Sequence, residues 1–235
     1  MTAPVAVIAG TGGAGTACAL AFAAAGYHVV TLDARTEAAD AAAAAVLADG
    51  GSAESACVDL LDAQAVTSLR DDLIARHGRV DVLVHLVGGW RGTRTLELAS
   101  VDNWNALSPP IVGTLAVLTA VFGEDIRTSD VGRAYMVTST TAANPTAGNI
   151  AYAAAKSAAE AWMAGVAHFL RDSQAASVVV AVKALLTDQM IEAEPDKQWP
   201  GYTHVRDLAA AIVTSATTAA TNGSRLDLTA EYSGA

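Results

Sequence analysis

Three side chains in the second half of the chain have the types and the spacing needed for proton transfer. Tyr152 and Lys156 are four positions apart, and Ser139 lies 13 positions before Tyr152 (152 − 139). On a helix, residues i and i+4 share one face, so the phenol and the ammonium can point toward the same atom. The ammonium charge favours the phenolate, and we expect it to lower the tyrosine pKa from about 10 toward the working range. With Ser139 orienting an oxygen, these catalytic candidates suit the interconversion of a carbonyl and an alcohol.

A tyrosine and a lysine four positions apart are usually a packed ring beside a solvated ammonium. The surrounding elements indicate whether Tyr152 and Lys156 are instead catalytic. Apolar β-branched runs at Val5–Ala9, Tyr27–Leu32 and Val80–Val87 predict strands, and alanine-rich stretches between them predict helices. A strand at Arg133–Thr138 leads to the serine, and a helix over Ala151–Leu170 carries the tyrosine and the lysine. Repeated β–α–β units predict an α/β fold: a single Rossmann-fold domain over residues 1–235, with a doubly wound, mostly parallel sheet of about seven strands and helices on both faces.

A glycine-rich turn follows the first predicted strand. Gly10, Gly12 and Gly15 form a GxGxxG pattern between a strand and a helix, where backbone N–H groups can approach a pyrophosphate. A merely flexible turn is the alternative. Asp33 ends the second strand, and its carboxylate would bind ribose hydroxyls and repel a 2′-phosphate, which favours NAD(H). Arg35 lies two residues further on and leaves NADP(H) possible.

The composition argues against nucleic acid, metal ions and membranes as partners. The formal charge is −10 and we find no basic patch, so the sequence predicts no nucleic-acid partner. Cys18 and Cys57 lack metal-ligand spacing, and they predict no metal site and a reducing compartment. We expect no secretory leader and no membrane-spanning apolar run, and therefore a cytoplasmic protein without a membrane partner.

With these pieces placed, the chain resembles the short-chain dehydrogenase/reductase family over essentially its whole length. Ser139, Tyr152 and Lys156 match the catalytic residues of that family in type and spacing, and the glycine turn matches its cofactor loop. The resemblance implies that Asp59 and Leu60 lie near the adenine, although Asp59 is equally a candidate turn cap. The cofactor-binding residues expected from motif and resemblance together are Gly10, Gly12, Gly13, Ala14, Gly15, Asp33, Arg35, Asp59, Leu60, Val87, Gly88, Lys156 and Thr187.

Two departures from the family pattern matter more than the others. No asparagine stands where many members have one in the helix before Ser139, and Pro109-Pro110 predicts a break or kink in the helix region Val101–Phe122. The usual Pro-Gly after the sixth strand is absent, and a long loop is expected up to Thr203. In the family, helices corresponding to Val101–Phe122 and Ala151–Leu170 form subunit contacts, which implies a homodimer or homotetramer.

The substrate is predicted only as a class. The Gly88-Gly89-Trp90 turn is loosely similar to the dihydropteridine reductase branch of the family. Trp90 and Trp199 could stack on a flat ring, or they could serve only to anchor their loops. A carbonyl, quinone or pterin is therefore expected. The substrate candidates are Trp90, Arg91, Asn144, Met190 and Trp199, with His85 and Tyr202 nearby; His85 is read first as a core histidine. The rival class is a non-catalytic nicotinamide-nucleotide sensor or scaffold.

Overall fold

The computed structural model of the chain describes residues 3–218 and 220–229, so residues 1–2, 219 and 230–235 of the expected domain lie outside this description. Its centre is a seven-stranded sheet in the order β3-β2-β1-β4-β5-β6-β9, in which every neighbouring pair is parallel. The strands are β1 (Val5–Ala9), β2 (His28–Asp33), β3 (Ser52–Cys57), β4 (Val82–His85), β5 (Arg133–Ser139), β6 (Ala176–Val182) and β9 (Ser224–Asp227). The predicted fold class is confirmed.

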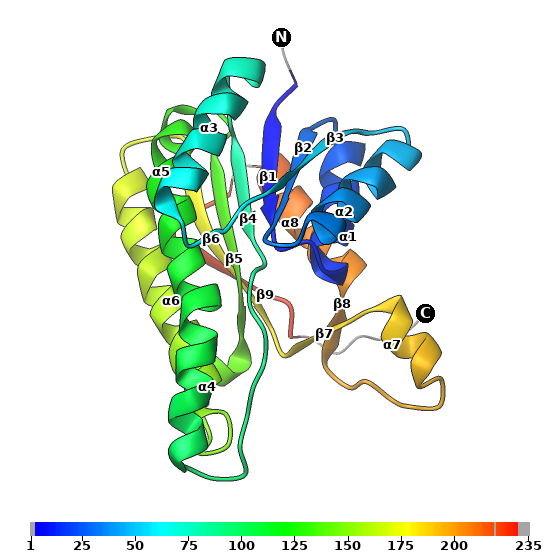
Figure 1. Cartoon of the computed structure of the whole chain (residues 1–235), viewed down its shortest axis with the longest axis vertical. Helices are drawn as coiled ribbons and strands as arrows, with labels where there is room; N and C mark the ends of the chain where they lie inside the picture. The colour runs from blue at the N-terminus through cyan, green and yellow to red at the C-terminus, as the bar shows by residue number, and fades with distance from the viewer. Residues whose placement is uncertain (1–2, 219, 230–235) are drawn as a thin grey trace.

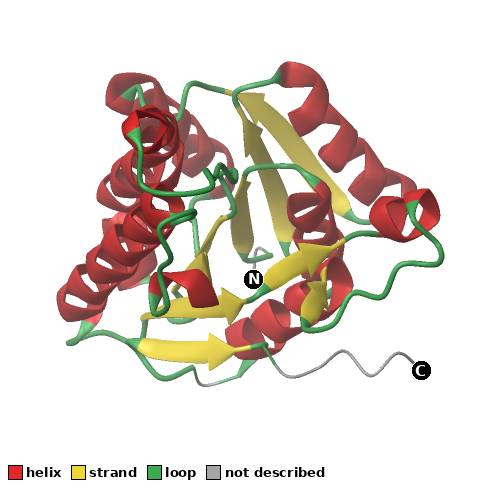
Figure 2. Cartoon of the chain, turned by 90° about the horizontal axis from the view of Figure 1, so that it is seen from below, coloured by secondary structure: helices red, strands yellow, loops and turns green. Residues whose placement is uncertain are grey.

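Helices cover both faces of this sheet (Figures 1 and 2). One face carries α1 (Gly13–Ala24), α2 (Thr36–Ala48) and α8 (Val205–Thr217). The other carries α3 (Ala63–His77), α4 (Leu98–Ser108), α5 (Thr114–Thr128) and α6 (Ile150–Leu170). Because each face buries its own apolar cluster, the central strands are apolar on both sides, as parallel strands usually are.

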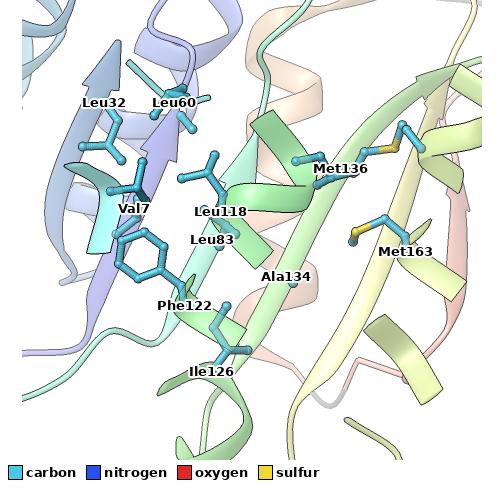
Figure 3. Packing of buried hydrophobic residues seen from close by; sticks show 14 of the residues in the cluster. Val7, Leu32, Leu60, Leu83, Leu118, Phe122, Ile126, Ala134, Met136 and Met163 are labelled. Carbon is cyan, nitrogen blue, oxygen red and sulfur yellow. The ribbon is translucent and has the colours of Figure 1, made fainter. Parts of the chain in front are cut away.

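The cluster under α5 and α6 sets the position of the catalytic candidates. Figure 3 shows Leu118 and Phe122 of α5 packed toward Val7 of β1 and Leu83 of β4. Met163 of α6 belongs to the same cluster, and all five side chains are almost completely buried. This packing places the first turns of α6 beside the carboxyl end of β5, where Ser139 lies.

The expected break at the two prolines is absent, and the helix continues through them with an irregular turn. Residues Pro109–Gly113 form a π-helical turn, η1, that joins α4 to α5. The Thr114 N–H donates to the carbonyl of Pro109, five residues earlier. A π-turn adds one residue to the helical turn. This accommodates the two proline rings, which have no N–H to donate to the regular α-helical hydrogen bonds.

The joined helix also corrects the expectation that no apolar run has membrane-spanning length. Leu98–Thr128 forms one helix of 31 residues with a mean hydropathy of 1.7 in its most apolar window. Leu107, Ile111, Leu115 and Leu118 along it are buried against the sheet. It is therefore a core helix of a soluble fold.

The segment after β6 is more ordered than the expected long loop. It contains β7 (Ala184–Leu186), α7 (Asp188–Ala193) and β8 (Tyr202–His204), and β7 and β8 pair as a small separate parallel sheet. Strands of three residues are too short to show an alternating pattern, which explains why the sequence did not predict them.

We expect Gly10→Ala to destabilise the fold. Gly10 has φ of 91°, and a Cβ there would lie 2.8 Å from the backbone nitrogen of Val87. The left-handed conformation alone costs a non-glycine residue about 1–2 kcal/mol, and the contact with Val87 adds to that cost. Urea unfolding measures the change.

Gly89→Ala is the matched control, because a Cβ at Gly89 has no atom within 4 Å and its φ is not positive. Its free energy of unfolding should stay within about 0.5 kcal/mol of the wild type. Equal stability of the two variants would contradict this account of Gly10.

Candidate active site

A cleft of about 540 Å³ opens at the carboxyl ends of β4, β5 and β6. Ser139 from β5 and the pair Tyr152 and Lys156 from α6 all line it, so the structure brings the three catalytic candidates together. The other lining residues that the sequence singled out are Ala14, Val87, Gly88, Trp90 and Tyr202. The crevice beyond the carboxyl ends of the strands is where open α/β sheets bind their ligands.

Lys156 is buried, and its ammonium is held by the backbone. The Nζ atom donates to the carbonyl oxygen of Val137 at 2.8 Å and lies 5.8 Å from the centre of the Tyr152 ring. Burial lowers the pKa of Lys156 to about 8, although the nearby Glu160 carboxylate acts in the opposite direction. A lysine with this pKa remains mostly charged at neutral pH and can give up its proton in mildly alkaline solution.

Tyr152 behaves differently from the expectation. Burial raises the pKa of Tyr152 above its ordinary value, and the hydrogen bond with Ser139 offsets only part of that rise. The predicted lowering by Lys156 is not produced by the chain alone, because desolvation disfavours the phenolate more than neighbouring groups favour it.

The Ser139 hydroxyl is oriented by several neighbours. It accepts hydrogen bonds from the Thr141 N–H at 3.3 Å and the Thr141 hydroxyl at 3.1 Å, and it lies 3.4 Å from the carbonyl oxygen of Lys183. Ser139 also caps the short 3-10 turn η2 (Thr140–Ala142). These contacts hold the hydroxyl at the edge of the cleft beside Tyr152.

A buried histidine, His85, ends β4 and is close enough to Lys156 to feel its charge. His85 Nε2 is 2.8 Å from the Thr114 hydroxyl, which itself donates to the carbonyl of Pro110 at 2.6 Å. Because that hydroxyl has a single proton, His85 must donate, and its ring is the neutral Nε2–H tautomer. Burial, with Lys156 adding, lowers the pKa of His85 to about 3, which agrees with a neutral core histidine. Sequence reasoning missed Thr114, since nothing in the pattern links it to a histidine 29 positions away.

The glycine turn forms a cradle at the N-terminus of α1. The first intrahelical bond runs from the Thr16 N–H to the Gly12 carbonyl, so the N–H groups of Gly13, Ala14 and Gly15 have no carbonyl partner within the helix. A Cβ at Gly15 would lie 2.0 Å from the carbonyl oxygen of Gly10, so only glycine permits this tight turn. N–H groups at a helix N-terminus suit a pyrophosphate, and these residues therefore fit a dinucleotide.

A second hollow of about 200 Å³ lies beside the turn and contains the residues expected around the adenosine. It is lined by Gly10, Asp33, Asp59, Leu60 and Val87, among others. The Asp33 carboxylate accepts hydrogen bonds from the N–H and the hydroxyl of Thr11 at 3.0 and 2.9 Å, and from the Arg35 N–H at 3.1 Å. Burial raises the pKa of Asp33, but these hydrogen bonds outweigh it, so the pKa lies below its ordinary value and the group is anionic.

The remaining cofactor candidates lie at the edges of these hollows. Arg35 pairs with Asp33 through Nε at 3.3 Å and is otherwise exposed. Asp59 accepts the Leu61 N–H at 3.0 Å, so it caps a turn in addition to lining the adenosine hollow. Thr187 caps α7, and its methyl group packs over Gly13, where a Cβ would be 2.9 Å away.

The substrate candidates divide into two groups. Trp90 lines the cleft and is 67% exposed, so its ring is available to a ligand. Arg91, Asn144, Met190 and Trp199 do not line it. Trp199 packs edge-on against Tyr202 at 5.2 Å, and Tyr202 is the residue that reaches the cleft.

Comparison with known proteins places the chain in a family. The family model described as short chain dehydrogenase matches residues 4–198. The chain belongs to the short-chain dehydrogenase family. It is 30% identical to a 3-oxoacyl-[acyl-carrier-protein] reductase of Synechocystis sp. over 203 residues, which cover 85% of this chain and 82% of that protein.

Solved structures with this fold carry either nicotinamide cofactor. A metagenomic short-chain oxidoreductase in complex with NADP is 26% identical, with a TM-score of 0.79 over 95% of this chain and 96% of that one. A xylitol dehydrogenase bound to NAD⁺ shares the fold at 21% identity, with a TM-score of 0.80 over 95% and 96% of the two chains. This short-chain dehydrogenase is therefore an oxidoreductase of a family that binds NAD or NADP, and the dihydropteridine reductase branch is not confirmed.

The buried ammonium should make stability depend on pH. The folded pKa of Lys156 is about 8 and the ordinary value is 10.5, so between these values the unfolded chain binds more protons than the folded chain. The free energy of unfolding contributed by Lys156 is therefore lowest below pH 8 and rises as pH increases toward 10.5.

Urea unfolding of the wild type and of Lys156→Met at pH 7 and pH 10 isolates this effect. The difference in free energy of unfolding, wild type minus variant, should increase by about 2 kcal/mol over that interval. A difference that does not change with pH would show that Lys156 titrates near its ordinary pKa.

Proposed function

We propose that this chain transfers hydride between a nicotinamide cofactor and the carbon of a small carbonyl or alcohol. One observation carries the proposal: Ser139, Tyr152 and Lys156 line the same cleft, and Ala14 of the glycine cradle lines it too. A reducible substrate and a dinucleotide would therefore meet beside the three polar side chains. When bound, the cofactor supplies the hydride, and the chain supplies orientation and proton transfer.

The roles proposed for the three residues are supported by their contacts and by the family resemblance. Tyr152 gives the proton to the substrate oxygen or takes it, because its hydroxyl is buried beside Ser139. Ser139 orients the same oxygen through its hydroxyl. By the family resemblance, Lys156 would hold the nicotinamide ribose, and its ammonium lies 5.8 Å from the centre of the phenol ring, where its positive charge would stabilise the transition state.

The proposal includes a preference for NAD(H). The anionic Asp33 carboxylate lines the hollow beside the glycine turn, where it would bind ribose hydroxyls and repel a 2′-phosphate. Arg35 pairs with that carboxylate and leaves NADP(H) as a second cofactor. Comparison of kcat/KM for NADH and NADPH checks the preference, and a strong preference for NADPH would refute the role of Asp33.

The substrate class is a flat carbonyl compound, a quinone or a quinonoid pterin. The exposed ring of Trp90 and the ring of Tyr202 both border the cleft and offer aromatic surfaces on which such a molecule can stack. A pterin would take its proton on a ring nitrogen or through a neighbouring water. The rival reading, a nucleotide sensor without turnover, leaves the convergence of Ser139, Tyr152 and Lys156 unexplained.

We also propose that the chain acts in the cytoplasm as a homodimer or homotetramer. Trp162 and Phe169 of α6 are 43% and 48% exposed and border a shallow apolar hollow shared with α5. Large apolar side chains gathered on one helix face are typical of a surface that a second copy covers. Light scattering checks the assembly, and a monomer at working concentration would refute it.

Replacing Tyr152 with phenylalanine should remove turnover and leave cofactor binding almost unchanged. The hydroxyl is the group that exchanges the proton, and loss of a general acid–base group lowers kcat by about 10²–10⁴-fold. Steady-state kinetics with a panel of ketones, quinones and dihydropterin measures turnover, and NADH fluorescence measures the dissociation constant.

Tyr135→Phe is the matched control. The Tyr135 hydroxyl contacts Ser215 at 3.1 Å and does not line the cleft, so its loss should leave kcat close to that of the wild type. Full activity of Tyr152→Phe would refute the proton-transfer role. A wild type that binds NADH and oxidises it with no member of the panel would favour the sensor.

A further inference from the structure

We propose that His28, Glu54 and His77 form a binding site for a divalent transition-metal ion, with Zn²⁺ as the best fit. His28 begins β2, Glu54 lies on β3, and His77 is the last residue of α3 (elements labelled in Figure 1). None of the three lines the catalytic cleft or the adenosine hollow. The sequence predicted no metal site because the ligands are 26 and 23 positions apart (54 − 28 and 77 − 54), with no short motif.

The distances suit one small ion. Glu54 Oε1 is 2.7 Å from His77 Nε2 and 3.6 Å from His28 Nε2, and the three ligand atoms all lie within 4.8 Å of one another. Ligands 2.0–2.1 Å from a tetrahedral zinc ion are roughly 3.3 Å apart. Small rotations of the side chains would therefore enclose an ion without moving the backbone.

Neighbouring groups hold these side chains in place. In metal sites, hydrogen bonds from surrounding residues orient the ligands in the same way. His28 Nδ1 is 2.7 Å from the Ser52 hydroxyl, which can accept its proton, and the tautomer with that proton on Nδ1 has its Nε2 lone pair free for an ion. His28 Nε2 is buried and has no hydrogen-bond partner within the described part of the chain. Arg76 pairs with Oε2 of Glu54, which leaves Oε1 as the oxygen that faces the histidines.

The types of the three side chains also suit a metal. Two imidazoles and one carboxylate with a fourth position for water form a donor set that zinc takes in proteins.

Such an ion would join three elements at the edge of the sheet. β3 is the last strand on that side, and the ion would tie it to β2 and to the end of α3. Because a metal that binds only the folded chain stabilises it by mass action, zinc should raise the melting temperature. The proposal is independent of the reaction proposed above.

Zinc binding to the metal-free full-length protein tests the proposal. Equilibrium dialysis with elemental analysis should find one Zn²⁺ per chain, and Co²⁺ should give the visible absorption of a tetrahedral site with nitrogen and oxygen ligands. His28→Gln and His77→Gln should each weaken zinc binding by about tenfold or more and reduce the zinc-induced rise in melting temperature. Glu54→Gln tests the carboxylate in the same way.

Two variants serve as controls. His168→Gln removes an exposed histidine on α6, and Cys57→Ser removes the exposed thiol; both should bind zinc like the wild type. Circular dichroism and NADH binding establish that every variant is folded. The proposal is overturned if the wild type binds no zinc when zinc is in excess, if folded His28→Gln and His77→Gln bind as the wild type does, or if Cys57→Ser abolishes binding.

Discussion

The buried ammonium of Lys156 is the interaction on which the arrangement of the cleft depends. A charge inside a protein must be paired or hydrogen-bonded, and the Val137 carbonyl meets that need at 2.8 Å. This contact fixes α6 across the end of β5 and so sets Tyr152 against Ser139. One turn further along α6, Glu160 accepts the Thr138 hydroxyl at 2.6 Å, which ties the helix to the same strand a second time. Burial of the charged lysine costs free energy of desolvation. The same burial lowers its pKa to about 8, within the range where it can exchange a proton.

The parallel sheet supplies the other half of the site. The strand order reverses between β1 and β4, and at such a switch point the loops after the two strands separate and leave a crevice for a ligand. Gly10 and Gly15 let the loop after β1 turn closely enough to present the N-terminus of α1 to that crevice. The cofactor end and the proton-transfer end are therefore positioned by the same few strands.

The sequence predicts those features that depend on the spacing of residues close together in the chain. The strand–glycine–helix turn, the helix with Tyr152 and Lys156 on one face, and the strand before Ser139 all follow from spacing within about twenty residues. The unpredicted features depend on packing between distant segments. The π-turn lies within a helix that is buried before and after it, at Leu107 and Leu115, and the His85–Thr114 contact joins residues 29 positions apart. The raised pKa of Tyr152 was missed for the same reason, since desolvation is a sum over many neighbours.

Hydride transfer at this cleft is tested by following deuterium from NADH that carries deuterium at both C4 positions of the nicotinamide. We expect the wild type to reduce at least one ketone of a panel to an alcohol with deuterium on the carbinol carbon, while the hydroxyl proton comes from solvent. Oxidation of the labelled cofactor with no deuterium in the product would contradict hydride transfer at this cleft. Cofactor binding without oxidation by any member of the panel would contradict it equally.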